Sequence, residues 1–551
     1  MNEPDMSMEI SLRINQLIER YNGNSVCMAE LLCDHYDPQK LAFRIVGKDL
    51  QAYELTYGEL RRESERVAAA LSDLGVEPGD RVATLMGKSR EYLTSLMGIW
   101  RLGAVHVPLF TAFAPAQVAF RLGGSRAKMV VCDAGQIDKL APGSDMPADP
   151  QWRVITTGEA SAGQLQFEQL VNAQEPGFAA YRGNGDHPVI QLYTSGTTGT
   201  PKGVVMPIRS LASFQAYMEF GMDIRQDDVF WSAADPGWAY GLFTAIFGTL
   251  TTGANSILLA AGFSPESTYR ALSKFGVTNF TAAPTVYRAL KASDVPVPTD
   301  IKLRCASAAG EPLTPDVNMW AEKTFDVQVH DHYGQTEMGM LIGNHHHPDL
   351  QQPIKTGSMG VSLPGFKAQV LKSDSDVPAD VNEVGRLAID LSESPLAWFT
   401  GYADNAEKTA EKFVADGRWY ITGDVAEMDE DGFVHFSSRD DDVIIMAGYR
   451  IGPFEIESTL SKHPAVVESA AVARPDEVRG EVLEAFVVLS NDYPASDDLA
   501  KELQDFVKKS FAAHAYPRRI HFTVSLPKTP SGKIQRFLLR KQLADETASA
   551  N

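Results

Sequence analysis

Cysteine is scarce in this sequence, with four residues in a chain of 551. They are Cys27, Cys33, Cys132 and Cys305, and they form no CxxC pair. Each stands in apolar surroundings, so we interpret them as reduced thiols of the core in a reducing compartment. We assign them no chemistry.

Basic residues are also in deficit, with 50 Lys and Arg against 71 Asp and Glu and a formal net charge of −21. A strongly acidic chain repels phosphate backbones and anionic lipid surfaces unless its basic residues cluster locally. We therefore expect no nucleic-acid partner.

A long apolar run of the kind that spans a membrane is missing. Residues 236–265 contain no charged side chain, but Pro236, several glycines and several threonines interrupt them, whereas a spanning helix needs about twenty predominantly apolar residues. We predict buried helix and strand there, and no stable membrane insertion. The first residues, MNEPDMSMEISLRINQL, carry acidic side chains where an export signal needs a basic region and an apolar run. The expected location is the cytoplasm.

The chain is long, and 44% of its residues are hydrophobic. This length exceeds what a single hydrophobic core usually organises, so we expect two or more domains. The segment from Thr56 to Gly75 predicts an amphipathic helix with a capping box made by Thr56 and Glu59. Short apolar strands at 81–86, 129–132, 256–260 and 302–307 alternate with helical stretches such as 265–275. This alternation predicts parallel sheets covered on both faces over the first four hundred residues. After about Phe436 the pattern changes, and an acidic cluster at 440–442 suggests a hinge.

The most informative segment is YTSGTTGTPKGV, residues 193–204, which directly follows the predicted strand 189–193. Its glycines permit close approach of the backbone, its hydroxyls can donate to phosphate oxygens and Lys202 adds a positive charge. A Walker A loop would need glycine at 201 and Ser or Thr at 203, where the chain has Pro201 and Gly203. The spacing also lacks the middle glycine of a dinucleotide fingerprint. We predict a polyphosphate-binding loop of another kind.

Four later segments follow this loop, AGEP at 309–312, DHYGQTE at 331–337, YITGD at 420–424 with Arg439, and PKTPSGK at 527–533. Together and in this order they closely resemble the core motifs of the acyl-CoA synthetases, within the adenylate-forming superfamily, over roughly residues 190–540. The resemblance implies an α/β fold, with a large N-terminal domain of parallel-sheet subdomains (1–440) and a small mobile C-terminal α+β domain (441–551). It also implies a hinge at Asp441, ATP and CoA as co-substrates, and Mg²⁺.

The resemblance assigns roles in the activation of a carboxylic acid by ATP. Lys533 is the activation lysine, Lys202 shields the β- and γ-phosphates, Thr336 lies near the α-phosphate and Glu337 binds Mg²⁺. Asp424 holds the ribose hydroxyls, and Arg439 holds the ribose and phosphate side. The other ATP-binding residues it implies are Thr194, Ser195, Gly196, Thr197, Thr198, Gly199, Thr200, Gly310, Glu311, Pro312, Asp331, His332, Tyr333 and Gln335, with Tyr333 as a stacking surface for the base.

For the acyl pocket, the resemblance points to Trp238, Ala239, Tyr240, Ala309, Gly310 and Gly334. Acetate-specific relatives close this pocket with tryptophan at the position of Gly334, so we expect acids of about three to ten carbons and expect Gly334→Trp to favour acetate. The implied CoA-binding residues are Ala447, Gly448, Tyr449, Arg450, Arg479, Tyr516 and Arg518. Rotation at Asp441 would bring the glycine segment at 447–450 to the thiol tunnel.

Three alternatives stay open at this point. Aryl acids such as benzoates fit the same motifs, and so does an adenylation enzyme that loads a carrier protein in trans. A binding or regulatory protein with an inactive site is disfavoured, because each candidate catalytic position has a competent residue. The triplet His345, His346 and His347 is not expected to bind metal, since adjacent residues point in different directions and no Cys or Glu neighbour has ligand spacing.

Overall fold

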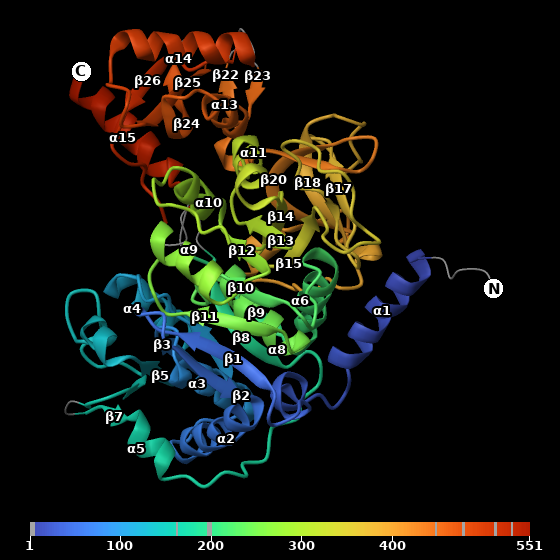
Figure 1. The fold of residues 1–551 in the computed structure, drawn as a ribbon, viewed down its shortest axis with the longest axis vertical. Helices are drawn as coiled ribbons and strands as arrows, with labels where there is room; N and C mark the ends of the chain where they lie inside the picture. Colours follow the sequence, from blue (N-terminus) through green and yellow to red (C-terminus); the bar gives the residue numbers. More distant parts are fainter. Residues whose placement is uncertain are drawn as a thin grey trace.

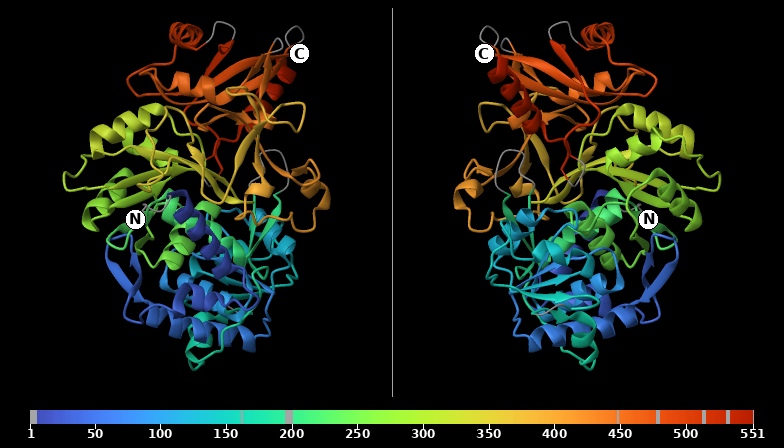
Figure 2. Two further views of the ribbon diagram at one scale, coloured as in Figure 1. Left: turned by 90° about the vertical axis from the view of Figure 1, so that its right-hand side faces the viewer. Right: turned by 90° about the vertical axis from the view of Figure 1, so that its left-hand side faces the viewer.

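The computed structural model describes residues 6–160, 163–194, 201–446, 449–476, 480–511, 515–529 and 533–550. Figure 1 shows two large sheets and their helices in the lower and middle parts of the molecule, with the C-terminal sheet and its helices above them. Figure 2 shows the same C-terminal part above the large sheets from both sides. None of the helices in these ranges is long and apolar enough to cross a membrane.

The first sheet has seven strands, which are parallel to their neighbours except at β9. In spatial order they are β7 (Leu165–Gln166), β6 (Arg153–Thr156), β5 (Met129–Cys132), β3 (Arg81–Leu85), β4 (Val105–Pro108), β8 (Pro188–Tyr193) and β9 (Gly203–Pro207). Its helices are α2 (Tyr57–Asp73), α3 (Arg90–Leu102), α4 (Pro115–Ser125) and α5 (Phe167–Asn172). The predicted phosphate loop therefore joins two paired strands, β8 and β9, at an edge of this sheet.

Helix α2 begins and ends where the sequence predicts. The Thr56 hydroxyl accepts from the backbone N–H of Glu59, and the Glu59 carboxylate accepts from the backbone N–H of Thr56, which completes the capping box. Leu60, Val67 and Leu71 are buried against the core. Gly75, just beyond the end of α2, adopts the left-handed conformation with φ of 86°.

The second sheet has nine strands, with a parallel centre and antiparallel edges. In spatial order they are β16 (Val361–Ser362), β15 (Gly339–Gly343), β14 (Val329–Gln335), β13 (Cys305–Ala309), β12 (Asn279–Ala282), β10 (Val229–Ser232), β11 (Asn255–Leu259), β1 (Leu41–Val46) and β2 (Ala52–Thr56). Its helices include α6 (Leu211–Ala216), α7 (Ala239–Gly241), α8 (Thr249–Thr252), α9 (Pro265–Lys274), α10 (Pro284–Lys291) and α11 (Pro315–Phe325).

Two details of the second sheet bear on the sequence predictions. The uncharged stretch 236–265 forms α7, the helix η5 (Leu242–Gly248), α8 and β11, so the prediction of buried helix and strand is confirmed. The strand predicted at 302–307 begins later, at Cys305, and the side chain of the preceding residue, Arg304, pairs with Asp223 and Asp228.

The third sheet is antiparallel, and the sequence patterns did not predict it. It comprises β17 (Ala368–Leu371), β18 (Gly385–Asp390), β19 (Phe413–Val414), β20 (Trp419–Met428) and β21 (Val434–Arg439). The prediction of parallel α/β structure up to about residue 400 is therefore wrong from Ala368 onward. In strands β17, β18 and β20 the buried residues are interrupted by half-buried ones.

The C-terminal sheet contains β22 (Ile444–Met446), β23 (Tyr449–Ile451), β24 (Val466–Asp476), β25 (Gly480–Leu489) and β26 (Arg519–Phe522). Its helices are α13 (Pro453–Leu460), α14 (Asp497–Ser510) and α15 (Arg536–Ala550). Buried side chains of these elements form a separate cluster that includes Ile456, Leu483 and Leu503. The segment therefore has a hydrophobic core of its own, as a domain requires.

Candidate functional site

One cavity of about 730 Å³ gathers most of the predicted residues. Among the residues it is lined by are Thr194, Lys202, Trp238, Ala239, Tyr240, Ala309, Gly310, Glu311, Pro312, Asp331, His332, Tyr333, Gly334, Gln335, Thr336, Glu337, Asp424, Arg439 and Lys533. They come from six stretches of the sequence, and the first and last of these lie more than three hundred residues apart. The cavity lies where the large sheets, the antiparallel sheet and the C-terminal segment meet.

Two parallel strands of the second sheet place the middle motifs side by side. Strands β13 and β14 are paired, with Ala309 opposite His332, so the segments that follow them leave the same edge of the sheet. Ligands of open α/β sheets bind at this carboxyl edge. Asp331 is buried within β14, and burial raises the pKa of its carboxyl to about 8.

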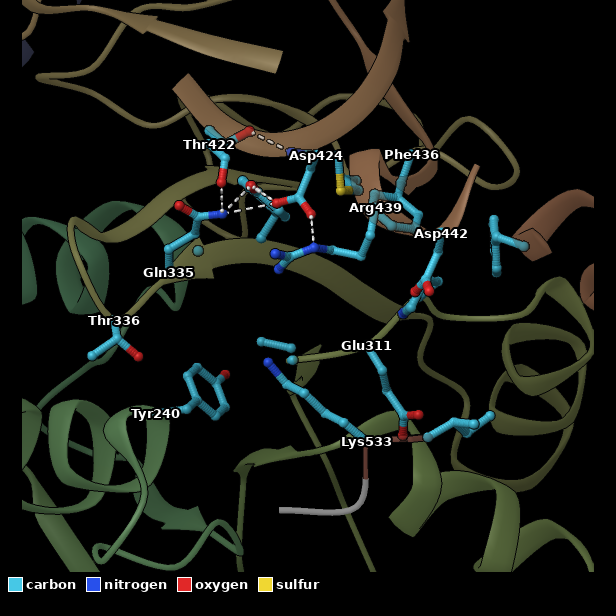
Figure 3. A pocket seen from close by; sticks show the side chains of 18 of the residues that line it. Tyr240, Glu311, Gln335, Thr336, Thr422, Asp424, Phe436, Arg439, Asp442 and Lys533 are labelled. Atoms are coloured by element: carbon cyan, nitrogen blue, oxygen red, sulfur yellow. Dashed lines mark hydrogen bonds and ion pairs between the residues drawn. The ribbon is translucent and has the colours of Figure 1, made fainter. Parts of the chain in front are cut away.

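Asp424 on β20 is the centre of a hydrogen-bonded group. Its carboxylate accepts from the Tyr333 hydroxyl and, at 2.8 Å, from the Gln335 amide, and it forms an ion pair with Arg439 Nε at 3.2 Å. Gln335 also donates to the Thr422 carbonyl at 3.0 Å (Figure 3). These contacts fix a carboxylate and a guanidinium on one side of the cavity, where they can bind hydroxyl and phosphate groups.

Tyr402 links Glu337 to Lys202. Its hydroxyl donates to Glu337 Oε1 at 2.7 Å, and the Lys202 ammonium lies over its ring, 4.8 Å from the centroid. Glu337 is buried, and Oε1 is the carboxylate oxygen that Tyr402 contacts among the described residues, so Oε2 could bind a cation. A hard divalent cation such as Mg²⁺ prefers oxygen ligands of this kind, so the residues present fit one.

Lys533 reaches into the cavity from the C-terminal segment. Figure 3 shows its amino group between Tyr240 and the pair formed by Asp424 and Arg439. Burial lowers the pKa of the Lys533 ammonium, while the carboxylates of Asp424 and Glu311 act in the opposite direction. The structure thus places a cation with a depressed pKa at the centre of the site.

The acyl end of the cavity begins at Trp238, whose ring lies against Gly310. A Cβ atom at Gly310 would lie 2.7 Å from that ring, and Gly310 has φ of 105°, a conformation that favours glycine. The Lys533 ammonium lies 6.0 Å from the centroid of the same ring. The Trp238 ring therefore lies close to both Lys533 and Gly310 and forms one wall of the cavity.

The structure contradicts the expected effect of Gly334→Trp. A Cβ atom at Gly334 would lie 2.3 Å from the Gly339 carbonyl oxygen and 2.7 Å from Met340 Sδ. Backbone Gly339 belongs to β15, which pairs with β14, so it cannot retreat without breaking the strand pair. Tryptophan at this position has no room, and Met340 already occupies the adjacent space.

We expect even Gly334→Ala to destabilise the fold, by about 3 kcal/mol or more, because the added methyl group meets backbone rather than a flexible side chain. Thermal or denaturant unfolding measures this loss. Gly123→Ala in α4 is the matched control, since a Cβ there meets nothing within 4 Å. Equal stability of the two variants would show that β15 moves freely and that position 334 does admit a side chain.

Polar groups behind the acyl wall are already paired with one another. The Tyr240 hydroxyl contacts the hydroxyls of Tyr217 at 3.0 Å and Thr281 at 2.6 Å. His332 contacts the Tyr217 hydroxyl through Nδ1 at 2.8 Å and the Asn344 carbonyl through Nε2 at 3.0 Å. The wall consequently offers the cavity mainly carbon surface.

The histidine triplet contributes to a cluster that the sequence did not reveal. Ring nitrogens of His330, His332 and His346 lie within 4.8 Å of one another, and the rings of His330 and His346 stack at 3.6 Å. Burial lowers the pKa of His330 to about 4 and that of His332 to about 3. Both nitrogens of His332 have protein partners, so the cluster is built as a hydrogen-bonded support for the acyl wall.

Two predicted residues of the C-terminal segment lie outside the cavity. Tyr516 and Arg518 lie elsewhere on the C-terminal segment, where the Arg518 guanidinium covers the Tyr516 ring at 4.0 Å. The backbone of Asp441 belongs to the short helix η7 (Asp440–Asp442), and Tyr449 and Arg450 belong to β23. The predicted residues that lie outside the described ranges are Ser195, Gly196, Thr197, Thr198, Gly199, Thr200, Ala447, Gly448 and Arg479.

Sequence reasoning missed several residues that line the same cavity, among them Tyr402, Arg288, Lys412 and Met340. Lys412 donates to the carbonyls of Ile421 and Thr422 at 3.0 and 2.9 Å. Each of these residues lies outside the five motifs. The sequence around Tyr402 does not identify it as a site residue, because its contacts with Glu337 and Lys202 join residues that are distant in the sequence.

Comparison with known proteins adds independent findings. A family model described as AMP-binding enzyme matches residues 35–401, and one described as AMP-binding enzyme C-terminal domain matches residues 455–533. Acetyl-coenzyme A synthetase of Bacillus subtilis is 36% identical, over 88% of this chain and 84% of its own. The crystal structure of Brucella canis acyl-CoA synthetase is 40% identical with a TM-score of 0.76, covering 98% and 99% of the two chains. The anthranilate CoA ligase AuaEII, solved with anthranoyl-AMP, is 27% identical with a TM-score of 0.86, covering 96% and 99%.

Proposed function

Because the chain belongs to the AMP-binding enzyme family and is an AMP-forming acyl-CoA synthetase, we propose that it activates apolar carboxylic acids larger than acetate. The proposed range is about three to ten carbons, straight or branched. The reaction converts the acid, ATP and CoA into acyl-CoA, AMP and pyrophosphate through an acyl-adenylate.

The acyl wall carries this proposal. Trp238, Phe243, Ala309 and Met340 present carbon surface to the cavity, and the polar atoms of Tyr240 and His332 are held by other protein groups. A polar acid tail would lose its hydrogen bonds to water and find these protein donors and acceptors already paired, whereas an apolar tail has no hydrogen bonds to lose. Met340, which lies beside Gly334, is the side chain that limits this end of the cavity.

In the first half-reaction a carboxylate oxygen attacks the α-phosphorus, and the bond from that phosphorus to the pyrophosphate oxygen breaks. Lys533 neutralises the two anions that must approach each other, and Thr336 donates to an α-phosphate oxygen. Asp424 and Arg439 orient the ribose, Tyr333 supports the base and Lys202 holds the departing pyrophosphate. Holding these groups in one geometry accounts for a large part of the rate.

Glu337 is the proposed Mg²⁺ ligand. The Tyr402 hydroxyl binds one carboxylate oxygen and so turns the other toward the cavity. Bound Mg²⁺ supplies charge neutralisation for the phosphate oxygens. The contribution of the protein to Mg²⁺ binding is that the hydrogen bond from Tyr402 fixes the orientation of the Glu337 carboxylate.

In the second half-reaction the CoA sulfur attacks the carbonyl carbon of the adenylate, the thiol loses its proton and AMP leaves. Lys533 lines the cavity in this structure, so we propose that a thiol reaches the carbonyl in a different arrangement of the C-terminal segment. We propose that residues 441–551 rotate about Asp441 and bring the 447–450 segment to the cavity. Tyr516, Arg518 and Arg479 are the proposed contacts of the CoA nucleotide.

Acid-dependent release of AMP, measured with and without CoA, tests the proposed reaction. We expect release to require both CoA and an apolar acid, and to yield one acyl-CoA for each AMP. Turnover of benzoate or anthranilate in preference to aliphatic acids would replace the proposal with an aryl-acid ligase. Adenylate formation with no transfer to CoA would instead indicate a carrier protein as the acceptor.

Met340 should limit the length of the acid, since its side chain lines the cavity beside Gly334. Met340→Ala is expected to shift the ratio of kcat/KM for octanoate over butanoate upward by about tenfold, because each additional buried methylene contributes about 0.8 kcal/mol. Met319→Ala is the matched control, as Met319 is 66% exposed on α11. An unchanged ratio in Met340→Ala would show that the tail lies elsewhere.

A further inference from the structure

The turn that carries Lys533 is held at both ends by ion pairs. Beyond Lys533, Arg536 on α15 pairs with Glu457 at 2.7 Å and with Asp442 at 3.6 Å. Before it, Lys528 pairs with Glu468 on β24 at 2.8 Å. The ends of the turn also meet through a backbone bridge between Lys528 and Ile534. The position of Lys533 therefore depends on where Glu468 and Glu457 are held.

Glu468 is in turn contacted from the large part of the molecule. Arg288 on α10 lies 3.7 Å from the Glu468 carboxylate, and the same guanidinium group pairs with Glu311 at 2.9 Å. Glu311 is itself fixed, because it accepts from the backbone N–H of Thr285 at 2.7 Å. All four residues that matter, Arg288, Glu311, Glu468 and Lys533, line one cavity.

We propose that the ion pair between Arg288 and Glu468 holds the C-terminal segment in the arrangement that presents Lys533, which makes Glu468 a positioning residue for adenylation alone. The inference rests on the proposed two-step function. When residues 441–551 rotate for the second half-reaction, this pair separates while the pairs on either side of it persist.

The ion pairs that remain on either side explain how the pair between Arg288 and Glu468 can separate in every catalytic cycle. A buried charge without a partner is costly. When Arg288 and Glu468 separate, Arg288 still pairs with Glu311, and Glu468 still pairs with Lys528. The side chains of Arg288 and Glu468 are also partly exposed, by 19% and 15%, and exposure to solvent weakens the ion pair between them. The pair thus biases the arrangement without locking it.

The two half-reactions, assayed separately, test this inference. Glu468→Gln is expected to lower acid-dependent ATP–pyrophosphate exchange about tenfold, as a population shift away from the competent arrangement. Thioester formation from supplied acyl-AMP and CoA should stay within about twofold of wild type. Glu502→Gln on α14, where the carboxylate is 64% exposed, is the matched control and should change neither rate. Arg288→Gln should also lower exchange. The loss in the double variant should be smaller than the product of the two single losses, because both substitutions remove the same ion pair.

Exchange by Glu468→Gln within twofold of wild type would overturn the inference. So would an equal fall of both half-reactions, or full additivity of the two substitutions. A wild-type protein without acid-dependent exchange or without transfer to CoA would overturn the proposed function and this inference with it. Failure of the proposed function would appear in the wild-type assays alone, whereas failure of this inference would appear only when the variants are compared with wild type.

Discussion

Lys533→Ala should abolish adenylation, with a loss of about a hundredfold to a thousandfold in ATP–pyrophosphate exchange. The ammonium group lies inside the cavity, and burial lowers its pKa, which means that the fold accepts a desolvation cost to place a cation there. A buried cation opposite two approaching anions stabilises the transition state more than one in water would. Alanine removes the charge and leaves the backbone turn intact.

Thioester formation from supplied acyl-AMP should continue in the same Lys533→Ala protein, since this step contains no attack on phosphorus. Lys541→Ala, an exposed lysine of the same helix α15, controls for the loss of a positive charge near the C-terminus. Normal exchange by Lys533→Ala would remove Lys533 from the chemistry. A parallel loss of both half-reactions would assign it a structural role.

Glu337→Gln should cause the second large loss, of about a hundredfold in exchange, together with a shift of the Mg²⁺ dependence to higher concentration. The substituted amide keeps the shape of the side chain and still accepts from Tyr402, so the change is confined to charge. Direct titration of Mg²⁺ in the presence of a non-hydrolysable ATP analogue measures the weakened binding without turnover. Glu407→Gln, on the exposed face of α12 (Ala406–Ala410), is the matched control.

An unaltered Mg²⁺ titration in Glu337→Gln would contradict the proposed ligand role. Loss of exchange with normal Mg²⁺ binding would point instead to a role for Glu337 in holding Tyr402 and Lys202. The two readouts separate these possibilities because Tyr402 contacts the carboxylate through one oxygen only.

The motifs could be recognised in the sequence because each one combines several chemically suited residues within a few positions. The loop at 193–204, the segment 331–337 and Lys533 were all assigned to one ATP and acyl site, and Thr194, Lys202, residues 331–337 and Lys533 line one cavity. Parallel pairing of β13 and β14 explains part of this convergence, because the ends of neighbouring parallel strands share one edge.

Residues that act through distant partners escaped prediction. Tyr402 matters through Glu337, and Arg288 matters through Glu468, yet each member of these pairs is an ordinary residue in its own stretch of sequence. The lack of space at Gly334 depends on the Gly339 backbone across a strand pair, which composition does not reveal. The antiparallel sheet from Ala368 onward was missed because its short strands lie in sequence that continues directly from the α/β region.

The most direct test of the account compares kcat/KM for hexanoate and acetate in CoA-dependent release of AMP by the wild-type protein. An open, apolar acyl end bounded by Trp238 and Met340 predicts that hexanoate is preferred by about tenfold or more. A preference for acetate, or equal values for the two acids, would contradict the account.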